Sequence, residues 1–236
     1  MKKTVLILIL GLSLGCNSEN KVDPSKDAEK HDKHQHHKKN SGHGTANEFM
    51  HKSSFEDLIV RFESPERDAY QHPDKVLEHL GDIDGKTIMD IGAGSGYFSV
   101  KLAEKGAKVI AADVNDKFLK YIQNRIEKSN LQNIEIRKIP YDSPGLTEQE
   151  VDRVLIVNTY HHIENRADYF AQVKKGTNTD GALVVIDFFK TDTPVGPPAD
   201  HKLSMDVVVN ELKKAGYTSF AITVDLLPYQ YIITAK

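Results

Sequence analysis

A glycine-rich loop reads Asp90-Ile91-Gly92-Ala93-Gly94-Ser95-Gly96 and lies between an apolar run, residues 86–91, and a run with helical periodicity, residues 95–105. Glycines at alternate positions allow a tight turn and let a ligand approach the backbone at the start of the helix. A dinucleotide-binding fingerprint would need a third glycine at position 97, where the sequence has Tyr97. The loop therefore predicts a ligand site between a strand and a helix, in a register that disfavours a nicotinamide-dependent enzyme.

Strand and helix patterns alternate along the chain after this loop. Runs such as residues 154–157 and 183–186 are apolar throughout, which is typical of parallel strands covered on both faces. The alternation predicts an α/β fold, a doubly wound, Rossmann-like and mostly parallel sheet with its ligand site at the carboxyl ends of the strands. The expected strands are residues 86–91, 107–113, 134–139, 151–158, 182–189, 218–226 and 229–235, and the expected helices are residues 95–105, 116–129, 166–175 and 204–215.

The two ends of this domain have their own patterns. The connection between the last two strands is too short for a crossover, so they must form an antiparallel hairpin, which completes a seven-stranded sheet. Ahead of the sheet, the spacing predicts a helix that is capped by Ser54 and ends before Pro65, and a second short helix from Pro73 to Gly81. Residues 48–236 are thus expected to form one domain with an N-terminal helical extension.

The register G-x-G-x-G, with Asp90 two residues before Gly92, resembles motif I of the class I S-adenosylmethionine-dependent methyltransferases. Asp113 lies 21 residues after Gly92, at the end of the expected second strand, where such enzymes place the acid that binds both ribose hydroxyls. The resemblance covers about residues 70–236. It implies S-adenosyl-L-methionine as the cofactor, bound by Asp90, Gly92, Gly94, Gly96 and Asp113.

Two further positions match the family less closely. Asp142 follows the expected third strand, where the family often places an acid against the adenine amino group; the alternative is a turn-forming aspartate before Ser143. Asn158 opens the segment Asn158-Thr159-Tyr160-His161-His162 after the fourth strand, and this segment is similar to motif IV, where cofactor and acceptor meet. The resemblance therefore adds Asp142 and Asn158 to the expected cofactor site.

Three histidines are candidates for a catalytic role. Methyl transfer is a direct displacement, so the protein aligns donor and acceptor and removes a proton if the nucleophile carries one. His161 and His162 follow the fourth strand, and His201 lies in a proline-rich loop, residues 194–202, after the fifth strand. Each of the three has a structural alternative, in which it only holds a loop in place.

Charge and cysteine content restrict the acceptor. Residues 48–236 carry 23 Lys and Arg against 29 Asp and Glu, and no stretch interleaves basic with aromatic residues. A surface that neutralises phosphates is therefore missing, which disfavours nucleic acid as the acceptor. The only cysteine is Cys16, so a thiol-dependent methylation of metalloids is disfavoured as well. A small-molecule acceptor is expected.

The N-terminus has the pattern of a bacterial export signal. Lys2 and Lys3 precede an apolar run, residues 5–15, which is too short to span a bilayer as a helix. The run ends at Cys16 and resembles a lipobox, although Ser13 stands where an aliphatic residue is usual. We expect a signal peptide over residues 1–15, a lipid on Cys16 and a location in the cell envelope. The alternative is an unused signal, which would leave the protein in the cytoplasm.

Residues 16–47 form the next segment, whose only apolar residues after Cys16 are Val22, Ala28 and Ala46. Such a segment buries too little surface to offset its ordering entropy, so we expect a disordered tether. Its histidines predict weak binding of a transition metal, or else belong to a solvated tether without such a function. The candidate ligands are His31, His34, His36 and His37.

Two functions are compatible with these patterns. The first is a methyltransferase that acts on a small molecule and is tethered to a membrane through Cys16. The second is an inactive methyltransferase fold that serves as a ligand- or metal-binding lipoprotein of the envelope. The second arises because export would take the chain to a compartment where the methyl donor is not expected.

Overall fold

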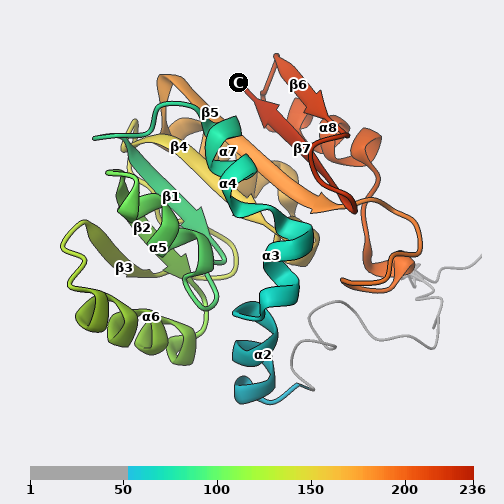
Figure 1. The fold of residues 1–236 in the computed structure, drawn as a ribbon. Helices are drawn as coiled ribbons and strands as arrows, with labels where there is room; N and C mark the ends of the chain where they lie inside the picture. Colours follow the sequence, from blue (N-terminus) through green and yellow to red (C-terminus); the bar gives the residue numbers. More distant parts are fainter. Residues whose placement is uncertain (1–52) are drawn as a thin grey trace, which may run out of the picture. The chain divides into compact units, whose positions relative to one another are not determined.

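The computed structural model of the chain describes residues 53–236 (Figure 1). The predicted signal peptide, the lipidation site Cys16, the tether and its histidines lie outside the described residues and stay predictions. Among residues 53–236, no helix combines the length and apolar character needed to cross a membrane.

The sheet has seven strands in the order β3-β2-β1-β4-β5-β7-β6. The first five of these run parallel, and β7 pairs antiparallel with both β5 and β6. The order reverses between β1 and β4, and such a switch point opens a crevice at the carboxyl ends of the strands. The predicted fold class is therefore confirmed. The strands are β1 Thr87–Ile91, β2 Lys108–Asp113, β3 Ile134–Lys138, β4 Val151–Val157, β5 Thr177–Phe188, β6 Phe220–Thr223 and β7 Gln230–Ala235.

Helices cover both faces of the sheet, because neighbouring residues of the central strands belong to different cores. In β4, Val154 packs with α7 and α8, whereas Leu155 packs with α4 and α5 on the other face. In Figure 1, α4 and α5 lie in front of the sheet and α7 lies behind it. The helices are α2 Phe55–Phe62, α3 Pro65–Gln71, α4 Pro73–Leu80, α5 Tyr97–Glu104, α6 Asp116–Ser129, α7 Arg166–Gly176 and α8 Met205–Lys214, with 3-10 turns at Tyr160–His162 and Ala199–His201.

Three elements differ from the sequence prediction. The sequence predicts that Pro65 ends a helix, but in the structure Ser64 caps a further helix, α3, in which Pro65 takes the first position. Strand β5 begins at Thr177, five residues before the predicted start, and an irregularity against β4 between Val151 and Arg153 accommodates the extra length. Strand β6 covers only the part of the predicted run that pairs with β7, and before it Thr218 and Ser219 hydrogen-bond to the backbone of Lys236.

The helical extension is fixed to the carboxyl-terminal edge of the sheet by polar contacts. Arg125 of α6 donates to Glu63 at 2.6 Å and to the carbonyl of Ser95 at 3.0 Å. The hydroxyl of Tyr97 donates to Asp68 of α3. In Figure 1, α2 and α3 lie beside the arrowheads of the central strands. The extension is thus held next to the glycine-rich loop.

Three side-chain amides close a ring at this edge. Gln71 donates to Gln230 at 2.9 Å, Gln230 donates to Asn158 at 2.6 Å, and Asn158 donates to Gln71 at 3.4 Å. The two glutamines are fully buried, and each amide uses both its donor and its acceptor within the ring. The ring links the end of α3, the end of β4 and the start of β7, which are far apart in the sequence.

We predict that this ring couples Gln71 and Gln230 energetically. Replacing either by Leu leaves amide groups of the ring without partners, at a cost of about 1–3 kcal/mol for each buried group. We expect urea unfolding to show that the double variant loses less free energy of unfolding than Gln71→Leu and Gln230→Leu lose together. The exposed Gln132→Ala serves as the control and should change stability by less than about 0.5 kcal/mol. Strictly additive losses of unfolding free energy would contradict this coupling through the ring.

Candidate active site

A cavity of about 600 Å³ opens at the carboxyl ends of the strands. It lies at the switch point between β1 and β4, where α/β sheets bind their ligands. The helical extension forms one wall, and the loops that follow strands β1 to β5 form the others. Residues that line it include Leu58, Arg61, Phe62, Arg67, Tyr70, Gly92, Ala93, Gly94, Asp113, Asn115, Phe118, Tyr141, Asn158, Thr159, His161, His162, Phe188, Pro194, Val195, Gly196, Pro197 and His201.

The glycine-rich loop has the backbone conformation that its sequence predicts. Gly92, Gly94 and Gly96 have φ angles of 71°, 57° and 77°, which side chains disfavour. A Cβ atom on Gly92 would lie 2.4 to 2.9 Å from three atoms of the Thr159 side chain, so the segment after β4 packs directly on this glycine. Gly92 and Gly94 line the cavity, whereas Gly96 lies behind it against Ile122.

Asp113 lies at the end of β2 and lines the cavity, as predicted. One carboxylate oxygen accepts the backbone N–H of Gly94 at 2.9 Å, and the other accepts that of Asn115 at 2.8 Å. Burial raises the pKa of Asp113, and these N–H donors oppose that shift. A carboxylate has about four acceptor positions, so Asp113 keeps the capacity to accept from a ligand.

The other predicted cofactor residues divide into two groups. Asn158 lines the cavity and has a φ angle of 54°, but its amide belongs to the buried ring. Asp90 and Asp142 are not among the residues that line the cavity. Asp90 is buried and accepts from the hydroxyl of Ser99 at 2.6 Å, and burial raises its pKa to about 6. In this part of the chain the residue that lines the cavity is Tyr141, which precedes Asp142.

The structure brings the three predicted histidines to the same cavity. The rings of His161 and His162 lie 4.3 Å apart. Burial, and then the neighbouring His161, lower the pKa of His162 to about 4, so this ring is neutral at neutral pH. His201 lies on the 3-10 turn in the loop between β5 and α8. We refer to the end of the cavity where they cluster as the acceptor side, after the role that the sequence predicts for them.

Sequence reasoning missed Asp187, the buried partner of His161. Its two carboxylate oxygens lie 2.8 and 3.1 Å from Nδ1 of His161, and the side chain is fully buried near the end of β5. One available signal was an acid directly after the apolar run at residues 183–186, where a charge is costly without a partner.

Arg67 was missed as well. Its guanidinium lies 4.0 Å from the ring centroid of Tyr97, and it donates to the carbonyl of Phe62 at 3.0 Å. Burial lowers the pKa of Arg67, and its Nε is buried without a hydrogen-bond partner among residues 53–236. Because Arg67 also lines the cavity, it offers a cationic donor to an anionic group of a ligand.

The loop after β5 shapes the acceptor side. The buried amine of Lys202 donates to the carbonyl of Thr191 at 2.8 Å and to the hydroxyl of Thr193 at 2.6 Å. Gly196 packs on Phe188 so closely that a Cβ atom would lie 2.6 Å from the ring. These contacts hold the proline-rich loop over the end of β5.

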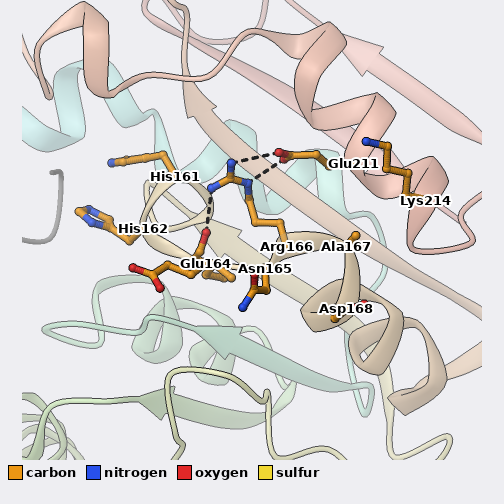
Figure 2. Close-up of a pocket in the computed structure, with 10 residues that line it drawn as sticks. His161, His162, Glu164, Asn165, Arg166, Ala167, Asp168, Glu211 and Lys214 are labelled. Carbon is orange, nitrogen blue, oxygen red and sulfur yellow. Dashed lines mark hydrogen bonds and ion pairs between the residues drawn. The ribbon is translucent and has the colours of Figure 1, made fainter. Parts of the chain in front are cut away.

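A second, open hollow of about 580 Å³ lies on the other side of the histidine pair. Figure 2 shows its lining, in which the guanidinium of Arg166 donates two hydrogen bonds to the carboxylate of Glu211, at 2.7 and 3.0 Å. His161 and His162 line both the hollow and the cavity, so this pair forms a wall between them. Within residues 53–236, no cluster of three or more potential ligands could hold a metal ion.

Comparison with known proteins agrees with this geometry. Residues 89–185 match the methyltransferase domain family. A solved S-adenosylmethionine-dependent methyltransferase from Aquifex aeolicus is 25% identical with a TM-score of 0.72, covering 78% of this chain and 98% of that one. Residues 89–185 are thus similar to a methyltransferase domain, and we refer to them as the methyltransferase core.

Curated relatives of this methyltransferase core act in different reactions. A tRNA U34 carboxymethyltransferase from Haemophilus influenzae is 28% identical in an alignment of 165 positions that covers 62% of this chain and 49% of the relative. A ubiquinone biosynthesis O-methyltransferase from Acinetobacter baylyi is 29% identical over 97 residues, 41% of this chain and 40% of the relative. The chain thus spans about half the length of the curated relatives it matches, or less.

We predict that Gly92 of the methyltransferase core is required for packing as well as for its φ angle. Gly92→Ala should destabilise the protein more than Gly85→Ala, because both glycines have similar φ angles (71° and 69°) but a Cβ on Gly85 meets nothing within 4 Å. The backbone strain of an alanine at such a φ angle costs both variants about 1–2 kcal/mol. Urea unfolding of the two variants measures the difference, and Thr159→Ala should recover part of the Gly92→Ala loss. Equal losses of unfolding free energy in the two variants would refute the role of the contact between Gly92 and Thr159.

Proposed function

We propose that this protein is an S-adenosyl-L-methionine-dependent methyltransferase that acts on a small-molecule acceptor. The observation that carries the proposal is Asp113, which two backbone N–H groups hold at the wall of a cavity shared with His161. Gly92 and Gly94 expose backbone to the same cavity, and the unpartnered Nε of Arg67 suits the carboxylate of a bound cofactor. When bound, the cofactor supplies a methyl group on a sulfonium cation.

A small acceptor fits this domain better than a nucleic acid. Residues 48–236 carry 23 basic against 29 acidic residues, so no general attraction to phosphates is expected. The acceptor side of the cavity is closed by the loop after β5 and lined by Phe188, Val195 and Pro197. The tRNA-modifying relatives argue for the other class, but they share only half of their length with this chain.

The location in the cell envelope is a separate part of the proposal. It rests on the sequence of residues 1–47, namely the apolar run before Cys16 and the polar segment after it. We propose that Cys16 carries a lipid and that residues 16–47 tether the domain to the membrane. Weak transition-metal binding by His31, His34, His36 and His37 belongs to the same proposal.

We predict that the full chain binds S-adenosylmethionine and that Asp113 contributes strongly. Loss of a hydrogen bond to a charged group costs about 1.5–3 kcal/mol, so isothermal titration should give a dissociation constant about 10- to 100-fold weaker for Asp113→Asn. Asp142→Asn is the matched control, because Asp142 does not line the cavity, and its affinity should stay within twofold of the wild type. Absence of wild-type binding at millimolar cofactor would favour the non-catalytic lipoprotein.

We also predict that the mature protein begins at a modified Cys16. Mass spectrometry of protein isolated from bacterial membranes should show an N-terminal peptide that starts at Cys16 and carries acyl chains. Cys16→Ser should abolish this modification and release the protein from the membrane fraction. An intact Met1 on the wild-type protein would contradict both export and lipidation.

A further inference from the structure

We infer that Asp187 is a positioning residue that fixes the tautomer of His161, so that Nε2 of His161 accepts the proton of a hydroxylated aromatic acceptor. This inference rests on the proposed methyltransferase function and extends it to the class of acceptor.

The geometry determines which nitrogen carries the proton. Both carboxylate oxygens of Asp187 lie within 3.1 Å of Nδ1 of His161. An ionised carboxylate only accepts hydrogen bonds, so Nδ1 must donate, and in the neutral ring the lone pair then belongs to Nε2. Asp187 is fully buried and 3% of the His161 side chain is exposed, so the pair is shielded from water. Because His161 lines the cavity, Nε2 is the ring nitrogen left for a ligand.

Charged and titratable groups surround the pair. Three groups interact electrostatically with Asp187 but hydrogen-bond elsewhere: Arg166 with Glu211, Lys202 with the loop at residues 191–193, and Tyr231 with the carbonyl of Leu203.

The remaining two groups are histidines. His162 packs on His161, and His201 lies close enough to His162 to interact with it electrostatically. The ring of His162 is neutral at neutral pH, because its pKa is lowered to about 4. Of the groups around Asp187, His161 is thus the one bound to both of its oxygens.

The acceptor side suits a flat, uncharged ring. Tyr70 and Phe188 stand with ring centroids 6.0 Å apart, and Val195 and Pro197 line the same region. Apolar walls beside Nε2 of His161 would bind an aromatic ring and orient its hydroxyl toward this nitrogen. A hydroxyl needs its proton removed as it attacks, whereas an acceptor that is already ionised does not.

The step balances without a further reactant. The acceptor oxygen forms the new C–O bond to the methyl group, the C–S bond breaks with its electron pair left on the sulfur, and the O–H proton passes to Nε2 of His161. The open hollow of Figure 2 shares His161 and His162 with the cavity and is also lined by the exposed Glu164. It offers the proton a way to bulk water after the transfer.

The first test measures the tautomer of His161 in the full chain by long-range ¹H–¹⁵N NMR, with His161→Gln to assign the signals. The wild type should carry its proton on Nδ1. In Asp187→Asn the amide donates to Nδ1, so the proton should move to Nε2. A wild-type ring that is protonated on Nε2, or a tautomer that the substitution leaves unchanged, would overturn the inference whether or not the protein is active.

The second test compares two methyl acceptors at pH 8, catechol and thiophenol, with radiolabelled S-adenosylmethionine and the full chain. Thiophenol is largely ionised at this pH and needs no base. For catechol, Asp187→Asn should lower kcat about 100-fold or more. For thiophenol, kcat should change by less than threefold. If Asp187→Asn does not fold, Asp187→Ser should show the same selectivity, because it also lacks the carboxylate that holds the proton on Nδ1 of His161.

The two proposals fail in different ways. Absence of cofactor binding by the wild type would refute the methyltransferase function itself. Cofactor binding without transfer to catechol would refute the aromatic hydroxyl as the acceptor class. Equal losses with catechol and thiophenol would show that Asp187 only stabilises the structure, and would overturn its role in positioning His161.

Discussion

The ring of three amides is the constraint on which the site depends. Gln71, Asn158 and Gln230 belong to three segments that are remote in the sequence, and their amides pair with one another. Both glutamines are fully buried. Buried amides are costly unless they are fully paired, so the segments are held in one arrangement. That arrangement places the α3 wall of the cavity against the segment that carries His161.

Three aspartates near the ends of parallel strands show how the same side chain acquires different properties. Asp90 pairs with a hydroxyl, Asp113 with two backbone N–H groups and Asp187 with an imidazole. Only Asp113 of the three lines the cavity, so it is the one that can bind a ligand directly. Asp187 acts through His161, and Asp90 lies behind the loop, where burial raises its pKa to about 6.

Most of the fold could be predicted from the sequence, because its signals are local. The apolar runs, the glycine register and the short final connection predict the strands, their direction and a ligand site at their carboxyl ends. The helix α3 was missed because a proline before a polar stretch can end a helix or begin one. Contacts between side chains that are remote in the sequence were missed as well: Asp187 pairs with His161, and Arg67 lies against Tyr97, which belong to other elements. The three histidines of the cavity could be predicted, because they lie in segments that follow β4 and β5, and the carboxyl ends of parallel strands meet at one edge of the sheet.

The account is tested most directly by a crystal structure of the full chain with S-adenosylhomocysteine, the demethylated form of the cofactor. It predicts that the ribose hydroxyls contact the carboxylate of Asp113 and that the sulfur faces His161 across the cavity. It further predicts that the carboxylate of the ligand binds Arg67. A ligand bound in the hollow of Figure 2, or a ribose turned away from Asp113, would contradict the account.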